Sequence, residues 1–172
     1  SRVSRGLGDV YKRQILKIST KNKSCNYWIW NGFKIAWFVE NEKDKTPLLF
    51  LHGFGANSNH WRKNIKNFAK NDYTVYSMDL LGFGESDQPG IKEIGKLDNG
   101  IWCDQVTDFI IDIIRPINTN KLVIIGNSLG GLVALTSAVS IPEEISGIIA
   151  SPLPDPIGCL LYTSPSPRDT RE

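Results

Sequence analysis

Hydrophobic and polar positions along the chain fall into two kinds of block. Short runs made up mostly of apolar residues are typical of strands covered on both faces, and they occur at residues 48–51, 73–78, 122–125 and 145–150; the run at 48–51 is unbroken. Between them, apolar residues recur at helical spacing in residues 59–70, 102–114 and 132–140. Alternating strands and helices of this kind predict an α/β fold, with a mostly parallel sheet and helices on both of its faces.

The N-terminal part of the chain has a different pattern. Residues 27–33 and 34–40 are rich in aromatic and β-branched side chains and flank Asn31-Gly32. That dipeptide favours a tight turn, so the segment predicts an antiparallel hairpin. We interpret its aromatic residues as hairpin core rather than as a platform for a ligand; they are Tyr27, Trp28, Trp30 and Trp37.

Composition excludes several classes of protein. The 172 residues are 41% hydrophobic and 22% charged, which is too apolar for a disordered chain, and no apolar run approaches the length of a membrane span. Three cysteines without paired spacing predict neither a disulfide framework nor a zinc site, and they fit a reducing compartment. A formal charge of +2 gives no indication of a nucleic-acid partner.

The two ends of the chain differ in origin from its middle. Residues 4–14 read SRGLGDVYKRQ, the translation of a DNA sequence that resembles the transposase adapter used in short-read sequencing. The opposite strand, read from its second base, encodes CLLYTSPSPR and then an incomplete Asp or Glu codon, matching residues 159–169. We therefore interpret residues 1–14 and 159–172 as adapter-derived. Residues 15–158 then carry 14 basic and 15 acidic side chains, a net charge of −1.

The segment that indicates chemistry is G-x-S-x-G at residues 126–130, directly after one expected strand and directly before a helix. A serine in this context sits on a sharp turn that exposes its hydroxyl. Small residues such as Gly126 and Gly130 are needed there because the neighbouring backbone passes closely. The N-terminus of the following helix directs unpaired amides and a positive dipole end toward an oxyanion near Ser128.

A second motif, His52-Gly53-Phe54-Gly55, follows an earlier strand. A loop at that place supplies the other oxyanion donor, so the backbone N–H groups of Phe54 and Leu129 are the candidate pair. We expect His52 to shape this loop, with Gly53 as a supporting residue. His52 precedes Ser128, whereas the base in such a site follows the nucleophile.

Together, HGFG at 52–55, DLLGFGES at 79–86 and GNSLGG at 126–131 resemble the α/β-hydrolase superfamily in order and spacing, over essentially all of residues 15–158. The resemblance implies that Ser128 is a nucleophile and that no cofactor or metal is needed. Family members that act as haloalkane dehalogenases or epoxide hydrolases have Asp at this position, so Ser128 argues against those activities. Residues 15–158 are then the N-terminal portion of such a domain, with its C-terminal part missing.

Other polar groups receive structural interpretations. Asp79 and Asp87 are expected to be loop-structuring groups that accept backbone hydrogen bonds. Cys103 is interpreted as a small core residue and His60 as a surface residue at a helix start. Asp155 is a poor candidate for a catalytic acid, because it lies close to where the family's lid begins.

The resemblance implies a catalytic acid and histidine after the nucleophile, and no histidine follows Ser128. The chain as given is therefore predicted to be inactive, since a serine without a base is an ordinary alcohol. The parent protein is expected to hydrolyse an ester or similar acyl bond of a small or lipophilic substrate. The alternatives are a carbon–carbon bond hydrolase acting on ring-cleavage products and a non-catalytic binding protein. The cytoplasm is the default location, and the oligomeric state stays open.

The interpretation of the two ends is testable on the source DNA. Amplification outward from within the codons for residues 15–158 should yield native sequence that differs from residues 1–14 and 159–172. A native reading frame that continues through SRGLGDVYKRQ or CLLYTSPSPRD would show that the adapter interpretation is wrong.

Overall fold

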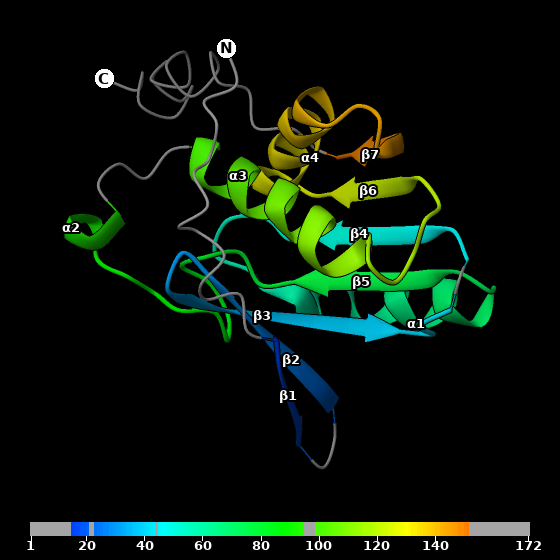
Figure 1. Ribbon diagram of the computed structural model, residues 1–172, viewed down its shortest axis with the longest axis horizontal. Helices are drawn as coiled ribbons and strands as arrows, with labels where there is room; N and C mark the ends of the chain where they lie inside the picture. Colours follow the sequence, from blue (N-terminus) through cyan, green and yellow to red (C-terminus); the bar gives the residue numbers. More distant parts are fainter. Residues whose placement is uncertain (1–14, 21–22, 44, 95–98, 152–172) are drawn as a thin grey trace, which may run out of the picture.

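The computed structural model describes residues 15–20, 23–43, 45–94 and 99–151. Seven strands form one sheet in the order β1-β2-β3-β5-β4-β6-β7 (Figure 1). The strands are β1 (Ile15–Thr20), β2 (Lys23–Trp30), β3 (Phe33–Glu40), β4 (Pro47–Leu51), β5 (Thr74–Met78), β6 (Leu122–Gly126) and β7 (Ile145–Ala150). The two segments interpreted as adapter-derived, and Asp155, lie outside the described residues.

The sheet is mixed. Strands β4, β5, β6 and β7 pair in parallel, whereas β1, β2, β3 and β5 pair antiparallel. Every residue of β4 is buried, as its unbroken apolar run predicted for a strand covered on both faces, and every residue of β5 is buried as well. The antiparallel part is larger than the predicted hairpin because β1 adds a further strand to its edge.

The hairpin forms at the predicted turn. Asn31 and Gly32 both have positive φ, 50° and 87°, which is the backbone of the two-residue turn that matches the twist of the flanking strands. Phe33 belongs to the second strand and pairs with Trp30. The sequence therefore located the turn correctly, but the first hairpin strand ends at Trp30 rather than at Phe33.

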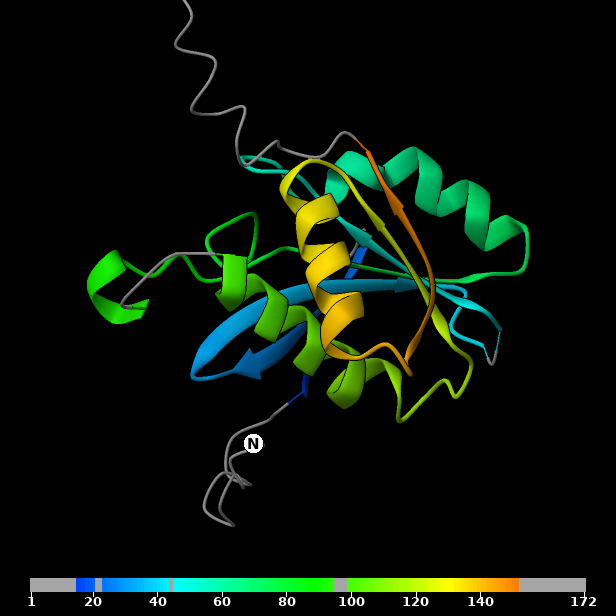
Figure 2. The same ribbon diagram turned by 90° about the horizontal axis from the view of Figure 1, so that it is seen from above.

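Helices cover both faces of the sheet, as predicted. Figures 1 and 2 show α3 and α4 on one face and α1 on the other. The helices are η1 (Ser58–Trp61), α1 (Arg62–Lys70), α2 (Ile91–Ile94), α3 (Asn99–Phe109), the π-helical turn η2 (Ile110–Ile114) and α4 (Leu129–Ser140). Within the described residues, no helix is long and apolar enough to cross a membrane.

The main hydrophobic core lies between the sheet and α3. The predicted helical stripe is buried at every position, namely Trp102, Val106, Phe109, Ile110, Ile113 and Ile114. Phe109 packs edge-on against Trp28 and Trp37, with ring centroids 5.7 and 5.6 Å apart. The hairpin tryptophans thus belong to the core, as predicted, while Tyr27 is half-buried with the Lys34 ammonium 4.9 Å from its ring.

One element boundary differs in a way that matters for the site. The apolar pattern predicted a helix from residue 132, whereas α4 begins at Leu129. Gly130 and Gly131 have low helix propensity, which hides the first turn from a pattern-based prediction. Tertiary packing overrides that propensity, because both glycines are buried.

Candidate active site

Ser128 occupies the sharp turn between β6 and α4. Its backbone has φ 53° and ψ −117°, a conformation that costs residues with a side chain on the order of 1–3 kcal/mol. Ser128 is the N-cap residue of α4, yet its side chain makes no capping hydrogen bond. Among the described residues, none hydrogen-bonds to the half-buried Ser128 hydroxyl. The turn therefore holds the hydroxyl free of the helix end.

Two glycines permit this turn, because the surrounding backbone leaves no room for a side chain. A Cβ atom at Gly126 would collide with the carbonyl group of Gly130. A Cβ atom at Gly130 would lie 2.7 Å from the carbonyl oxygen of His52 and would collide with that of Leu51, at the end of β4. The first turn of α4 therefore packs by its own backbone on the C-terminal end of β4.

The loop after β4 contacts the same turn. A Cβ atom at Gly53 would lie 3.0 Å from Asn127 Oδ1 and 3.3 Å from Ser128 Cβ. The N–H groups of Phe54, on this loop, and of Leu129, at the start of α4, have no acceptor within the described part of the chain. Two free amide donors on adjoining segments beside a serine are the arrangement that an oxyanion requires.

His52 connects the loop after β4 to the loop after β5. Its side chain is fully buried; Nε2 accepts the N–H of Leu80 at 3.0 Å and Nδ1 lies 2.8 Å from the carbonyl oxygen of Gly53. Because a backbone N–H only donates, this network assigns the proton to Nδ1. Burial lowers the pKa of His52, which favours the neutral ring. Both nitrogens are thus engaged by backbone, and neither is available to Ser128 as a base.

The two predicted loop-structuring carboxylates accept backbone hydrogen bonds. Asp79, at the end of β5, accepts the N–H groups of Ser58 at 2.7 Å and Glu85 at 2.9 Å. Asp87 accepts the N–H of Lys34 at 2.7 Å. Asp79 therefore joins the beginning of η1 to the glycine-rich loop after β5, as the sequence indicated for such residues.

An aromatic cluster next to the turn was missed by sequence reasoning. The Phe54 side chain is 73% exposed, and its ring packs edge-on against Phe83 at 5.3 Å. Phe83 also contacts the rings of His52, at 5.4 Å, and Trp102, at 6.1 Å. Trp102 was assigned to a helical stripe, and Phe83 lies in a glycine-punctuated loop. The aromatic side chain of Phe83 between two glycines is the one sequence feature that could have indicated this cluster. The cluster places an apolar wall beside the loop that carries Phe54.

The remaining candidates do not approach the serine. His60 is exposed, with its ring 4.9 Å from that of Trp61. Cys103 is buried and free, with its sulfur 3.6 Å from Ser140 Oγ. In the part of the chain that the structure describes, no group of three or more His, Cys, Asp or Glu residues is arranged to hold a metal ion. Ser128 therefore has its candidate oxyanion donors nearby, but no imidazole or carboxylate partner from these residues.

Comparison with known proteins gives a family match and several relatives. A family model described as alpha/beta hydrolase fold matches residues 46–157. Over 126 residues the chain is 36% identical to epoxide hydrolase 4 of Mus musculus, covering 73% of this chain and 33% of that protein. Over 140 residues it is 31% identical to the mouse protein 1-acylglycerol-3-phosphate O-acyltransferase ABHD5, covering 81% and 36%. The chain thus spans about a third of the length of these curated relatives.

Among solved structures, a bacterial membrane phospholipase A superposes with a TM-score of 0.66 and 27% sequence identity. The match covers 74% of this chain and 39% of the phospholipase chain. It extends the similarity from sequence to the arrangement of the sheet and its helices.

The space around the turn generates a prediction for a matched pair of glycines on adjacent strands. Gly126→Ala should lower the free energy of unfolding by about 1–3 kcal/mol or more, because the new methyl group meets rigid backbone. Gly147→Ala, on β7, is the control, because its nearest neighbour would be a Val123 methyl group at 3.8 Å. Urea unfolding of the full-length protein measures both. Equal destabilisation by the two changes would contradict the close approach at Gly126.

Burial of His52 generates a prediction for pH. Below the unfolded-state pKa of about 6.5, the unfolded chain binds a proton at this histidine that the folded protein does not bind. The free energy of unfolding should therefore decrease as the pH is lowered. The loss from His52 is at most about 1.4 kcal/mol per pH unit. His52→Gln should reduce this slope between about pH 6.5 and 5. A slope unaffected by His52→Gln would argue against a buried neutral ring.

Proposed function

Because the chain belongs to the α/β-hydrolase family, we propose that the full-length protein is a serine hydrolase. Its substrate is an ester, or a compound with a similar acyl bond, that is small or lipophilic. The observation that carries the proposal is the backbone of Ser128, held at φ 53° between β6 and α4. A side chain is kept in such a conformation only where the surrounding structure compensates its cost, and such positions cluster at active sites.

The geometry supports an acyl-enzyme mechanism. Ser128 Oγ attacks the carbonyl carbon and its proton passes to a general base, which this proposal places in the remainder of the full-length protein. The carbonyl oxygen becomes an oxyanion that accepts hydrogen bonds from the N–H groups of Phe54 and Leu129. Collapse of the tetrahedral intermediate breaks the bond to the leaving group, which takes up the proton. Water then hydrolyses the acyl-enzyme in a second step and regenerates Ser128.

The names of the relatives support acyl chemistry on a lipophilic compound. Phospholipase A and 1-acylglycerol-3-phosphate O-acyltransferase both denote proteins that act on acyl groups of glycerolipids. The aromatic wall of Phe54 and Phe83 beside the oxyanion loop is a suitable contact for the apolar part of such a substrate.

A second candidate, epoxide hydrolysis, is favoured by the 36% identity to epoxide hydrolase 4. Family members that act as epoxide hydrolases have an aspartate at this position, where this chain has the alcohol of Ser128. Carbon–carbon bond hydrolysis uses the same serine and oxyanion donors, so the residues after β7 would distinguish it from ester hydrolysis. A binding protein on this fold would lack the base altogether.

Covalent labelling of the full-length protein tests the assignment of the nucleophile. A fluorophosphonate probe should label the wild-type protein, and Ser128→Ala should abolish labelling and lower kcat for a p-nitrophenyl ester by at least 10³-fold, on the order seen for loss of a catalytic serine. Ser140→Ala, which changes an exposed serine on α4, is the matched control and should label normally.

The same experiment separates the alternatives. Labelling that persists in Ser128→Ala would overturn the nucleophile assignment. Turnover of an epoxide by a wild-type protein that resists the probe would favour the second candidate. A wild-type protein that neither reacts with the probe nor turns over any substrate would favour a binding protein.

A further inference from the structure

The outer surface of α1 carries a stripe of cations. Arg62, Lys66 and Lys70 follow one another at intervals of four residues, so they share one face of the helix, and Lys63 adjoins them. All four are exposed, and no described carboxylate forms an ion pair with any of them. Like charges at this spacing repel, which costs stability in an isolated helix. We call these four residues the basic stripe.

Charge is segregated around the basic stripe. The sequence from residue 45 to residue 71 contains no Asp or Glu. On the opposite face of the sheet, α3 and η2 carry Asp104, Asp108 and Asp112. One helix layer is thus basic and the other is acidic, although the whole chain has a formal charge of only +2.

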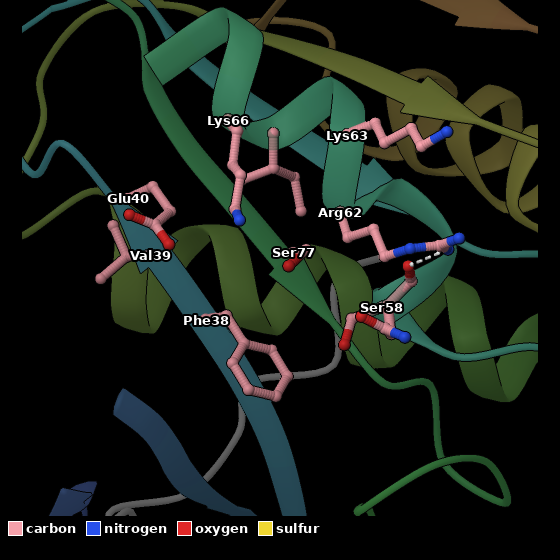
Figure 3. A pocket seen from close by; sticks show the side chains of 10 residues that line it. Phe38, Val39, Glu40, Ser58, Arg62, Lys63, Lys66 and Ser77 are labelled. Carbon is pink, nitrogen blue, oxygen red and sulfur yellow. Dashed lines mark hydrogen bonds between the residues drawn. The ribbon is translucent and has the colours of Figure 1, made fainter. Parts of the chain in front are cut away.

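A groove adjoins the basic stripe, between α1 and β3. Its cavity volume is about 410 Å³, and apolar Phe38, Val39 and Ile65 line it together with three of the four cations. Figure 3 shows Lys66 reaching from α1 over the groove. Glu40 is the carboxylate that lines the groove, and it forms no ion pair with Lys66 among the described contacts. The cations therefore lie beside a groove whose lining is partly apolar.

We propose that the basic stripe and this groove form a docking surface for bilayers rich in anionic phospholipid. A cluster of four or more Lys and Arg residues on an amphipathic helix is attracted to the negative potential of such a surface, at about 1 kcal/mol per cation. The apolar face of α1 packs on the sheet, so this helix offers the bilayer its charged face. The apolar residues of the groove would contact the apolar part of the lipid next to the head group.

A nucleic acid fits these observations less well. Nucleic-acid-binding domains combine a basic surface with a strongly basic overall charge, whereas the pI here is about 8.4. The groove beside the basic stripe is partly apolar, because Phe38, Val39 and Ile65 line it. A partly apolar groove next to cations matches a phospholipid interface, which presents phosphate and glycerol together.

Vesicle co-sedimentation of the full-length protein, carried out in the Ser128→Ala background, tests the docking surface without any dependence on hydrolysis. Binding to phosphatidylcholine vesicles that contain about one third phosphatidylserine should exceed binding to pure phosphatidylcholine and should weaken as salt is raised. Lys63→Gln combined with Lys66→Gln should weaken the partition coefficient about 25-fold, from about fivefold per cation.

The matched control is Lys92→Gln combined with Lys121→Gln, which removes two exposed lysines outside α1 and should leave the partition coefficient unchanged. Circular dichroism checks that both double variants are folded. Equal binding by the two double variants would overturn the proposal, as would equal binding to the two kinds of vesicle. Tighter binding to duplex DNA than to the anionic vesicles would assign the basic stripe to nucleic acid instead. A wild-type protein that resists the fluorophosphonate probe, with vesicle binding by the Ser128→Ala protein intact, would contradict only the proposed chemistry.

Discussion

The approach of the α4 backbone to the end of β4 is the constraint on which the candidate site depends. Gly130 lies so close to the carbonyl groups of Leu51 and His52 that any side chain there would displace the helix. This contact fixes the first turn of α4 at the C-terminal edge of the sheet, where Leu129 presents an N–H group without an acceptor among the described residues. It also forces the chain to turn sharply between the end of β6 at Gly126 and the start of α4 at Leu129. Ser128 lies in this turn and therefore has a positive φ. The strain at Ser128 is thus a consequence of backbone packing on both sides of it.

Buried hydrogen bonds hold the neighbouring loops against that turn. His52 and Asp79 are both almost fully buried, and burial of such polar groups is unfavourable unless they are paired. His52 accepts the N–H of Leu80, and the Asp79 carboxylate accepts those of Ser58 and Glu85. Each partner is a backbone N–H group of the loop after β5 or of the start of η1, so these side chains position main chain rather than substrate. The loop that carries Phe54 is therefore positioned by hydrogen bonds to the loop that follows β5.

The two faces of the sheet differ in physical character. Beneath α3, tryptophans from the hairpin and the Phe109 ring form a large aromatic core, which stabilises the antiparallel part of the sheet against the helix. The α1 face has a smaller apolar core around Phe50, and its outer surface is basic. One face therefore provides most of the buried apolar area of the described residues, and the other presents charge to its surroundings.

The sequence by itself determined the alternation of strands and helices, the Asn31-Gly32 turn and the position of Ser128 between a strand and a helix. These features follow from periodicity and from the backbone preferences of single residues, which are local properties of the chain. Local patterns did not reveal β1, the early start of α4 or the contact between Phe54 and Phe83. The first depends on pairing with β2, the second on packing that overrides the low helix propensity of two glycines, and the third on loops from different strands. The basic residues of α1 were visible in the sequence, but only the tertiary structure placed them beside a partly apolar groove, because the groove is formed by β3, β5 and α1 together.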